Sequence, residues 1–313
     1  MMRRIYAIGE SLVDIIFTDN QPKYAKAGGS MLNSTVSLGR IGLPVSLITE
    51  YGTDDPGNFI DSFLKENGVD TGTVYRFNEG KTALALAYLD EKNDARYTFY
   101  KSYPSNRLKV SLPTIQAGDF FLFGSIYSVT PEIREPFMNI VSESRKKGAL
   151  LIYDPNFRSS HARELSAFMP MIEENLGNAH LVRGSDEDFR NIFSTNTPGE
   201  TWETIKKYCG CLIYTRNSEG VSVFSKSFSG NFGVRKIKPV STIGAGDNFN
   251  AGLIASLYNM KVKPDSLAEL GEKEWKKIIS TAIDFASEVC MSYDNYIGLA
   301  FASKYLSASR LQI

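Results

Sequence analysis

The stretch STIGAGDNFNAG, Ser241–Gly252, joins a glycine-rich turn to the start of a helical pattern. The helical pattern runs from Asp247 to Tyr258, and its apolar residues share one face, at Phe249, Leu253, Ile254 and Leu257. Because the turn ends where the pattern begins, the sequence predicts a helix N-terminus with almost no side chains in front of it.

The turn itself consists of Gly244, Ala245 and Gly246. The first amides of a helix have no partners within the helix, and the helix dipole adds roughly half a positive charge at that end. Small residues let another group approach the main chain closely. We therefore expect the amides of these three residues to form an anion-binding site.

Asp247 places a carboxylate at the same helix N-terminus, and two interpretations are open. Aspartate is a preferred capping residue, so Asp247 could satisfy the amides of its own helix. Alternatively, it is a general base beside a phosphate site. It would then take a proton from a hydroxyl while the neighbouring amides hold the phosphoryl group that the hydroxyl attacks.

Composition narrows the class of protein. The 313 residues are 42% apolar, which is enough for one large domain or for a domain with an appendage. Lysine plus arginine and aspartate plus glutamate both number 35, so we expect neither nucleic acid nor an anionic membrane as a partner. No apolar run approaches the roughly 20 residues of a membrane span. Glu10 and Asp14 interrupt any signal peptide, so we expect a cytoplasmic protein.

Cysteine and histidine are scarce. Three cysteines, Cys209, Cys211 and Cys290, argue against a disulfide framework and read as small buried hydrophobic residues. With only two histidines in the chain, mechanisms that depend on histidine have few candidates. We expect carboxylates and main-chain amides to carry any chemistry.

Strand and helix patterns alternate along most of the chain. Strands are expected at Ile5–Ile8, Val45–Thr49, Phe120–Phe123, Leu150–Tyr153, His180–Val182 and Leu212–Thr215. Helices are expected at Asn33–Arg40, Phe59–Glu66, Ile133–Lys147, Asp247–Tyr258 and Glu274–Cys290. This alternation predicts an α/β fold, with a doubly wound, mostly parallel sheet and helices on both faces.

One region of the sequence does not alternate between strand and helix patterns. Lys81–Leu89 and Arg96–Lys101 read as strands separated by a polar turn at residues 90–94, with no helix between them. We expect a small antiparallel sheet here, attached to the larger core. A smaller sheet beside a doubly wound core predicts a cleft with a lid.

Two other phosphate-binding motifs fit the sequence poorly. A dinucleotide fingerprint would need a glycine where Phe249 stands. Gly52–Gly57 has the glycine spacing of a P-loop, but Asn58 stands where that motif needs lysine. We reject both motifs.

The stretch TIGAGDNFNAG resembles the C-terminal signature of the PfkB family of carbohydrate kinases, which includes ribokinase-like sugar and nucleoside kinases. Other segments resemble further family elements in order: Gly9–Asp14 the opening strand, Ala27–Asn33 with Leu38–Gly42 the N-terminal signature, Gly52–Gly57 the next loop, Tyr97–Lys101 the lid strand, and Asp154–Arg158 the DPN-x-R element of fructokinase-like members. The resemblance covers nearly the whole chain.

This resemblance implies a single ribokinase-like kinase domain over residues 1–313, with a lid formed by about 12–34 and 72–106. It implies ATP-dependent phosphorylation of a sugar hydroxyl, with Mg²⁺ carried in by ATP. Asp247 would be the catalytic base, beside an anion hole made by Gly244, Ala245 and Gly246. The residues implied to bind the sugar are Asp14, Gly28, Gly29, Asn33 and Arg158.

Each sugar-site assignment has a simpler alternative. Asp14 could be a solvated strand residue, Asn33 could cap the helix that follows it, and Arg158 could form a surface ion pair. The chemistry nevertheless suits the two polar types. An ionised aspartate accepts protons from two hydroxyls, and asparagine both donates and accepts.

The sequence departs from the family pattern at three places. Ser241 stands where an aspartate that helps hold a monovalent cation is usual, which puts a potassium requirement in doubt. The N/S-x-x-E element becomes Ser185 to Asp188, so a shorter carboxylate would reach Mg²⁺ through water. The nucleotide loop reads Thr215 to Gly220, with Asn217 in place of a glycine. The resemblance assigns Ser185, Asp188, Thr215, Asn217, Gly220 and Gly246 to the nucleotide.

A ketohexose such as fructose is the leading acceptor, because of the DPNFR and YTFYK segments. Ribose, 2-keto-3-deoxygluconate and nucleosides are alternatives, as is a sugar-binding descendant that has lost catalysis. The exposed edge of the lid sheet makes a homodimer through the lid an additional expectation.

Overall fold

The computed structural model describes residues 3–89, 95–111 and 114–310. Its main sheet has ten strands in the order β14-β13-β12-β11-β10-β9-β1-β4-β5, with β6 paired to β4. Every pairing in this sheet is parallel except those of β13 and β14. The strands are β1 Ile5–Ile8, β4 Val45–Gly52, β5 Val69–Asp70, β6 Val74–Phe77, β9 Phe120–Gly124, β10 Leu150–Asp154, β11 Leu181–Ser185, β12 Cys211–Thr215, β13 Val221–Ser225 and β14 Ser229–Phe232.

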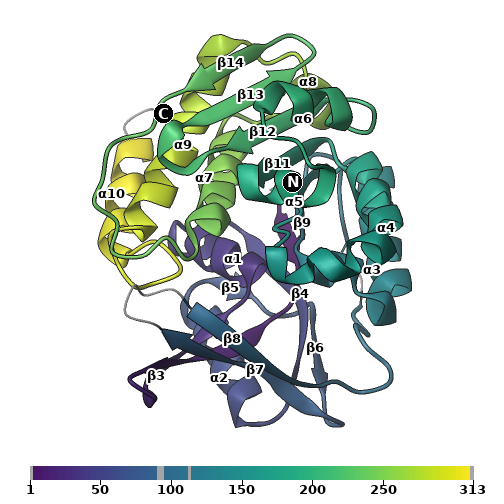
Figure 1. Cartoon of the computed structure of the whole chain (residues 1–313), viewed down its shortest axis with the longest axis vertical. Coiled ribbons are helices and arrows are strands. Elements are labelled where there is room, and N and C mark those ends of the chain that lie inside the picture. The colour runs from purple at the N-terminus through teal and green to yellow at the C-terminus, as the bar shows by residue number, and fades with distance from the viewer. Residues whose placement is uncertain (1–2, 90–94, 112–113, 311–313) are drawn as a thin grey trace.

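Helices cover both faces of the main sheet (Figure 1). One face packs against α1 Ser30–Arg40, α2 Asp55–Glu66, α7 Ala245–Asn259, α8 Pro264–Leu267, α9 Glu272–Val289 and α10 Leu299–Arg310. The other packs against α3 Arg134–Lys146, α4 Leu165–Asn178, α5 Asp186–Phe193 and α6 Pro198–Ile205. Short 3₁₀ turns occur at η1 Ile126–Val129, η2 Pro131–Ile133, η3 Ser159–Glu164 and η4 Asn217–Glu219.

The central strands are apolar along their whole length because both of their faces are covered. In β1, Ile5 and Ala7 belong to the apolar cluster on one face, whereas Tyr6 and Ile8 belong to the cluster on the other. Successive side chains of a strand point to opposite faces, so one short run contributes to two cores. This explains why the parallel strands are recognisable in the sequence as unbroken apolar runs.

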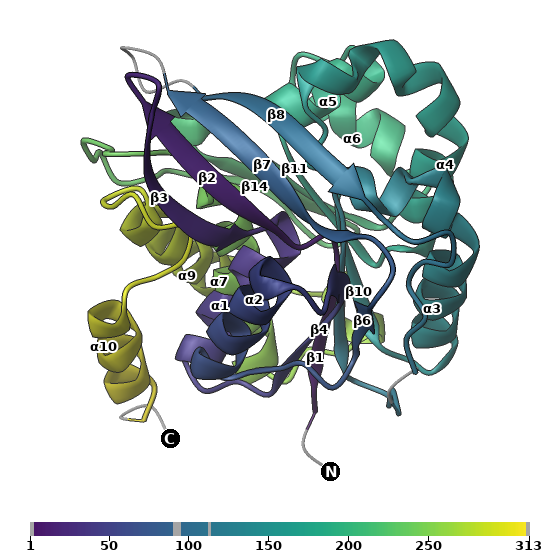
Figure 2. The ribbon, with the colours of Figure 1, turned by 90° about the horizontal axis from the view of Figure 1, so that it is seen from below.

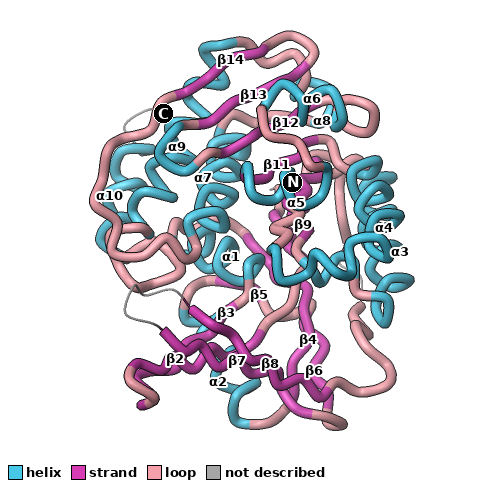
Figure 3. Tube along the Cα trace, viewed as in Figure 1, coloured by secondary structure: helices cyan, strands magenta, loops and turns pink. Residues whose placement is uncertain are grey.

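A second sheet lies apart from the main one, at the bottom of Figures 1 and 3. Its strand order is β3-β2-β7-β8, from β2 Leu12–Thr18, β3 Gln21–Gly28, β7 Lys81–Leu89 and β8 Ala95–Ser102. The outer pairings are antiparallel, whereas the central pairing of β2 with β7 is parallel. The turn expected at residues 90–94 lies outside the described residues.

The expected fold class is confirmed: a doubly wound, mostly parallel sheet carries a separate small sheet. Figure 2 shows the small sheet beside α1 and α2. Within the ranges expected for the lid, residues 30–34 belong to α1 and β6 pairs with β4 of the main sheet.

Two further expectations concern the whole chain. All three cysteines are buried and unpaired, as expected for small hydrophobic residues. Among the helices that the structure describes, none combines the length and the apolar character that a membrane crossing needs.

Candidate active site

Helix α7 begins at Ala245, with Gly244 as its N-cap in a left-handed conformation (φ 81°) that suits glycine. A Cβ on Gly244 would lie 2.8 Å from the carbonyl oxygen of Asn295, and one on Gly246 would lie 2.9 Å from Nη1 of Arg183. Gly244 is therefore required by the main chain beside it, whereas a Cβ at Gly246 would meet the end of the Arg183 side chain. The amides of both glycines stand at the N-terminus of a 15-residue helix, where an anion is stabilised.

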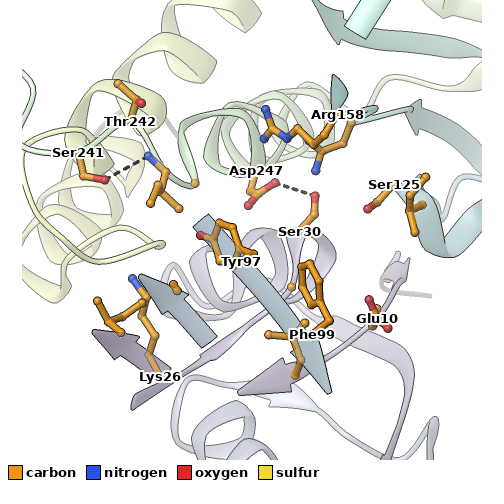
Figure 4. Close-up of a pocket in the computed structure, with 18 of the residues that line it drawn as sticks. Glu10, Lys26, Ser30, Tyr97, Phe99, Ser125, Arg158, Ser241, Thr242 and Asp247 are labelled. Atoms are coloured by element: carbon orange, nitrogen blue, oxygen red, sulfur yellow. Dashed lines mark hydrogen bonds between the residues drawn. The ribbon is translucent and has the colours of Figure 1, made fainter. Parts of the chain in front are cut away.

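Asp247 is the third residue of α7, and its side chain makes no capping bond to that helix. Its Oδ1 accepts a hydrogen bond from Ser30 Oγ (2.7 Å), and its Oδ2 accepts one from Nδ2 of Asn33 (2.8 Å; Figure 4 shows the first). The N-cap of α1 is Gly29. The capping interpretations of Asp247 and of Asn33 are therefore both wrong, because the two side chains bind each other across α1 and α7.

Burial is the main cause of an unusual pKa at Asp247. It raises the pKa to about 6, against the hydrogen bonds from Asn33 and Ser30, which favour the charged form. The negative charge of Asp154 raises the pKa further, and the positive charge of Arg158 lowers it. A carboxylate with this pKa is largely ionised at neutral pH and can still accept a proton, as a general base requires.

A cavity of about 1090 Å³ opens between α7, the small sheet and the loop after β10 (Figure 4). Of the residues expected at the sugar and anion sites, Gly29, Arg158, Gly244 and Asp247 line it. Asp14, Gly28, Asn33, Ala245 and Gly246 are not among the lining residues. Tyr97 and Phe99 of β8 form part of the opposite wall, with their rings stacked 5.8 Å apart.

Asp14 lies on β2 of the small sheet and is half-buried. Burial raises its pKa to about 6, and the cross-strand neighbour Lys26 lowers it. A Cβ on Gly28 would lie only 2.2 Å from Oδ2 of Asp14, so this glycine makes room for the carboxylate. Asp14 is therefore not a freely solvated strand residue.

Arg158 is an exposed residue at the rim of the cavity. Its Nη1 lies 3.8 Å from Oε2 of Glu187, which is a long ion pair in solvent. Its positive charge also acts on Asp247 and on Tyr97, so its guanidinium faces the cavity region. Both the surface ion pair and a role at the cavity are compatible with this position.

Apart from Gly246 on α7, the residues assigned to the nucleotide lie at or just after the carboxyl ends of β11 and β12. Ser185 caps α5, and Asp188 completes the capping box. The Asp188 carboxylate accepts hydrogen bonds from Ser185 N, Ser185 Oγ and Phe157 N, each at 2.6 Å, and is buried. These bonds give Asp188 a structural role, while its expected contact with Mg²⁺ through water remains a prediction.

Asn217 and Gly220 lie in the loop between β12 and β13. Asn217 has a left-handed backbone (φ 43°) and Gly220 also has a positive φ (110°). Asparagine tolerates the left-handed backbone conformation. Asn217 can therefore keep the loop conformation at the position where the family pattern has glycine. Ser241, at the place of the usual aspartate, accepts a hydrogen bond from Ile243 N (3.2 Å).

A buried ion pair that the sequence did not reveal lies beneath the N-terminus of α7. Arg183 donates to Asp154 (2.9 Å) and to Thr215 (3.0 Å), and its guanidinium lies 5.3 Å from the ring centre of Phe249. Asp154 also accepts from Nδ2 of Asn250 on α7 (2.6 Å). These contacts tie the N-terminal half of α7 to three parallel strands.

The sequence analysis assigned no role in the site to Glu10 or to Lys101. Both line the cavity, and Nζ of Lys101 lies 2.6 Å from Oε1 of Glu10. The Tyr103 hydroxyl donates to the same oxygen (2.6 Å). The carboxylate thus links the end of the small sheet to the loop after β1.

The sequence model of one protein family, described as "pfkB family carbohydrate kinase", matches residues 2–297 of this chain. The chain belongs to this family. It is a sugar kinase, and the family match spans both the small sheet and the α7 site.

Named relatives of this kinase include plant proteins. "Probable fructokinase-3" of Arabidopsis thaliana is 27% identical over 272 residues, covering 82% of this chain and 78% of the relative. "Fructokinase-2" of Solanum lycopersicum is 26% identical over 285 residues, covering 86% of each protein.

Solved structures share the ribokinase-like fold. Aminoimidazole riboside kinase from Salmonella enterica, complexed with aminoimidazole riboside and an ATP analogue, has a TM-score of 0.83 at 20% identity, covering 98% of this chain and 99% of its own. A fructokinase double mutant from Vibrio cholerae O395, bound to fructose, ADP and potassium ion, also has a TM-score of 0.83, at 21% identity and with coverage of 97% and 98%.

Proposed function

We propose that this kinase transfers the γ-phosphoryl group of ATP to a hydroxyl of a ketohexose such as fructose. The observation that carries the proposal is the position of Asp247, whose carboxylate lines the large cavity at the N-terminus of α7. The fructokinase names among its relatives, and the fructose bound in one structural neighbour, favour a ketohexose.

In this proposal Asp247 accepts the proton of the attacking sugar hydroxyl. Its pKa of about 6 leaves it ionised at neutral pH and basic enough to assist the attack. The amides at the start of α7, from Gly244 to Gly246, stabilise negative charge on the phosphoryl group during transfer. The reacting hydroxyl, the base and the anion site therefore meet at one helix terminus.

The remaining proposed sugar contacts come from the small sheet, from the start of α1 and from the loop after β10. Asp14 and Asn33 are the proposed partners of sugar hydroxyls, and Gly29 lines the cavity beside them. The stacked pair of Tyr97 and Phe99 gives an apolar wall for the C–H face of a sugar. Arg158 stands at the rim, where it can reach either the sugar or a phosphate oxygen.

Mg²⁺ bound to ATP would neutralise charge on the phosphate oxygens. The described residues hold no group of three or more histidine, cysteine, aspartate or glutamate side chains arranged to bind a metal. Mg²⁺ at nucleotide sites is usually held by substrate phosphates and water together with one or two carboxylates. Ser185, Asp188, Thr215, Asn217, Gly220 and Gly246 remain the proposed nucleotide contacts. The potassium requirement and the lid-mediated homodimer also remain predictions.

A coupled ADP-release assay with Mg-ATP tests the proposal across fructose, ribose, 2-keto-3-deoxygluconate and a nucleoside. We expect the highest kcat/KM with fructose, and a higher value with another acceptor would reassign the substrate. Asp247→Asn should lower turnover by at least about 10²–10³-fold, while calorimetry still detects sugar binding. Tight sugar binding by the wild type without turnover of any acceptor would instead indicate a non-catalytic descendant.

A further inference from the structure

Ser30 is the first residue of α1, and its hydroxyl faces the cavity beside Asp247 (Figure 4). It donates to Oδ1 of Asp247 at 2.7 Å, while Asn33 donates to Oδ2 at 2.8 Å. Residues three apart lie on the same face of a helix. One face of α1 therefore holds both oxygens of the carboxylate.

The main chain of Asp247 is held by the same helix. Ser34 donates from its hydroxyl to the carbonyl oxygen of Asp247 at 2.8 Å. The Asp247 side chain makes no capping hydrogen bond to the amides of α7 itself. The orientation of the carboxylate is therefore set by α1, and the bond from Ser30 is the one that lies on the cavity side.

The charged groups that act on Asp247 are few. Asp154, behind it at the end of β10, carries a negative charge, and Arg158, in the loop after β10, carries a positive one. Ser30 and Asn33 are neutral donors from α1. A donor to a carboxylate favours its ionised form, so the loss of either donor shifts the balance towards the protonated acid.

We propose that Ser30 is a positioning residue for the catalytic base, holding the Asp247 carboxylate in a fixed orientation and in its ionised form. The inference rests on the proposed function of Asp247, and it assigns a role to a residue that neither the motifs nor the comparisons single out. Ser30 acts through Asp247 and transfers no proton itself.

The experiment compares Ser30→Ala, Ser30→Thr and wild type. The first readout is a ¹³C NMR titration of protein labelled at the aspartate carboxyl carbons, with the Asp247 signal assigned from its loss in Asp247→Asn. Removing a hydrogen bond to a charged group should raise the Asp247 pKa in Ser30→Ala by about one unit. Ser30→Thr keeps the hydroxyl and should restore the wild-type pKa.

The second readout is kcat/KM for the sugar against pH. A rise in pKa from about 6 to about 7 lowers the ionised fraction about fivefold at pH 6 and barely changes it at pH 8. Ser30→Ala should therefore lose most activity at acid pH, whereas Ser30→Thr should follow the wild type. A purely structural role for Ser30 would lower activity equally at all pH values.

Thr35→Val is the matched control. The Thr35 hydroxyl is buried in the same helix and donates only to the carbonyl oxygen of Leu32 (2.8 Å). Its removal should leave the Asp247 pKa unchanged. An Asp247 pKa in Ser30→Ala that equals the wild-type pKa would overturn the inference, as would an equal shift in Thr35→Val.

The two proposals can fail separately. If Asp247→Asn keeps normal turnover, the base assignment fails, although the NMR titration still reports whether Ser30 controls the Asp247 pKa. If Asp247→Asn is inactive and the acid limb of Ser30→Ala does not move, the assignment of Ser30 fails while the proposed function stands.

Discussion

Replacing Asp247 by asparagine should stabilise the folded protein at neutral pH while removing its activity. Burial raises the pKa of Asp247 from an ordinary value of 3.8 to about 6. The folded state therefore holds a proton that the unfolded state releases between these values. Stability is highest below about pH 4, falls as the pH rises through this window, and stays lowered above pH 6.

The size of the effect follows from the shift. Each pKa unit corresponds to about 1.4 kcal/mol, so the ionised Asp247 lowers the free energy of unfolding by up to about 3 kcal/mol at pH 7.5. Contact of Asp247 with solvent in the cavity reduces this effect. We therefore expect the free energy of unfolding of Asp247→Asn to exceed that of the wild type by about 1–2 kcal/mol. The Asn33 side chain can adapt by turning its amide, because its Oδ1 is buried without a hydrogen-bond partner.

Urea unfolding of both proteins between pH 4 and 8, followed by circular dichroism, measures the effect. The difference in free energy of unfolding should grow from pH 4 to pH 6 and then level off. Asp54→Asn is a control of opposite sign. Burial alone would raise the Asp54 pKa, but hydrogen bonds from Thr82 and Gly57 outweigh it and lower that pKa. A less stable Asp247→Asn at pH 7.5, or a difference that does not depend on pH, would refute the reasoning.

Three further predictions concern the site. The value of kcat/KM for the sugar should fall below about pH 6 as Asp247 becomes protonated, and a flat profile down to pH 5 would contradict its role as base. Arg183→Met should lower the free energy of unfolding by about 3–5 kcal/mol in a urea titration, because it leaves the Asp154 carboxylate buried without its ion-pair partner. Gly29→Ala should raise KM for the sugar more than about tenfold or prevent folding, since its Cβ would meet the Glu10 carbonyl oxygen at 2.2 Å in a φ of 133°. A soluble Gly29→Ala protein with normal kinetics would show that the main chain can move aside.

The sequence predicted the parallel core well because its strands are buried on both faces. Such strands read as short apolar runs, and β9 (FFLFG) and β10 (LLIYD) are examples. The strand pattern of β3 is weaker, because Gln21–Gly28 is mostly exposed and lacks a clear alternation. Helix starts were less accurate, since α1 begins at Ser30, three residues before the expected Asn33.

The candidate site was predictable where one short segment carries the chemistry. The turn from Gly244 to Gly246 and the carboxylate of Asp247 lie within four residues of each other. The partners of that carboxylate lie more than 200 residues away, and no local pattern links Ser30 to Asp247.

Some residues that were assigned from the motif also make structural contacts that the motif does not show. Gly246 looked like a space for a phosphate, whereas the atom nearest to its missing Cβ belongs to Arg183. Asp188 looked like a metal contact, whereas its carboxylate completes a capping box and binds Phe157 N. A motif records which residue types occur together, and only tertiary contacts reveal what each side chain meets.

The parallel pairing of β2 with β7 has a consequence for how the chain acquires its shape. Val13 pairs with Leu84, and the intervening residues build α1, β4 and α2. Because pairing β2 with β7 closes a long loop, we expect the small sheet to form late and slowly during folding. The small sheet is built from two separate parts of the sequence, β2 with β3 and β7 with β8. Replacing the whole sheet by the sheet of a relative would therefore need two separate grafts.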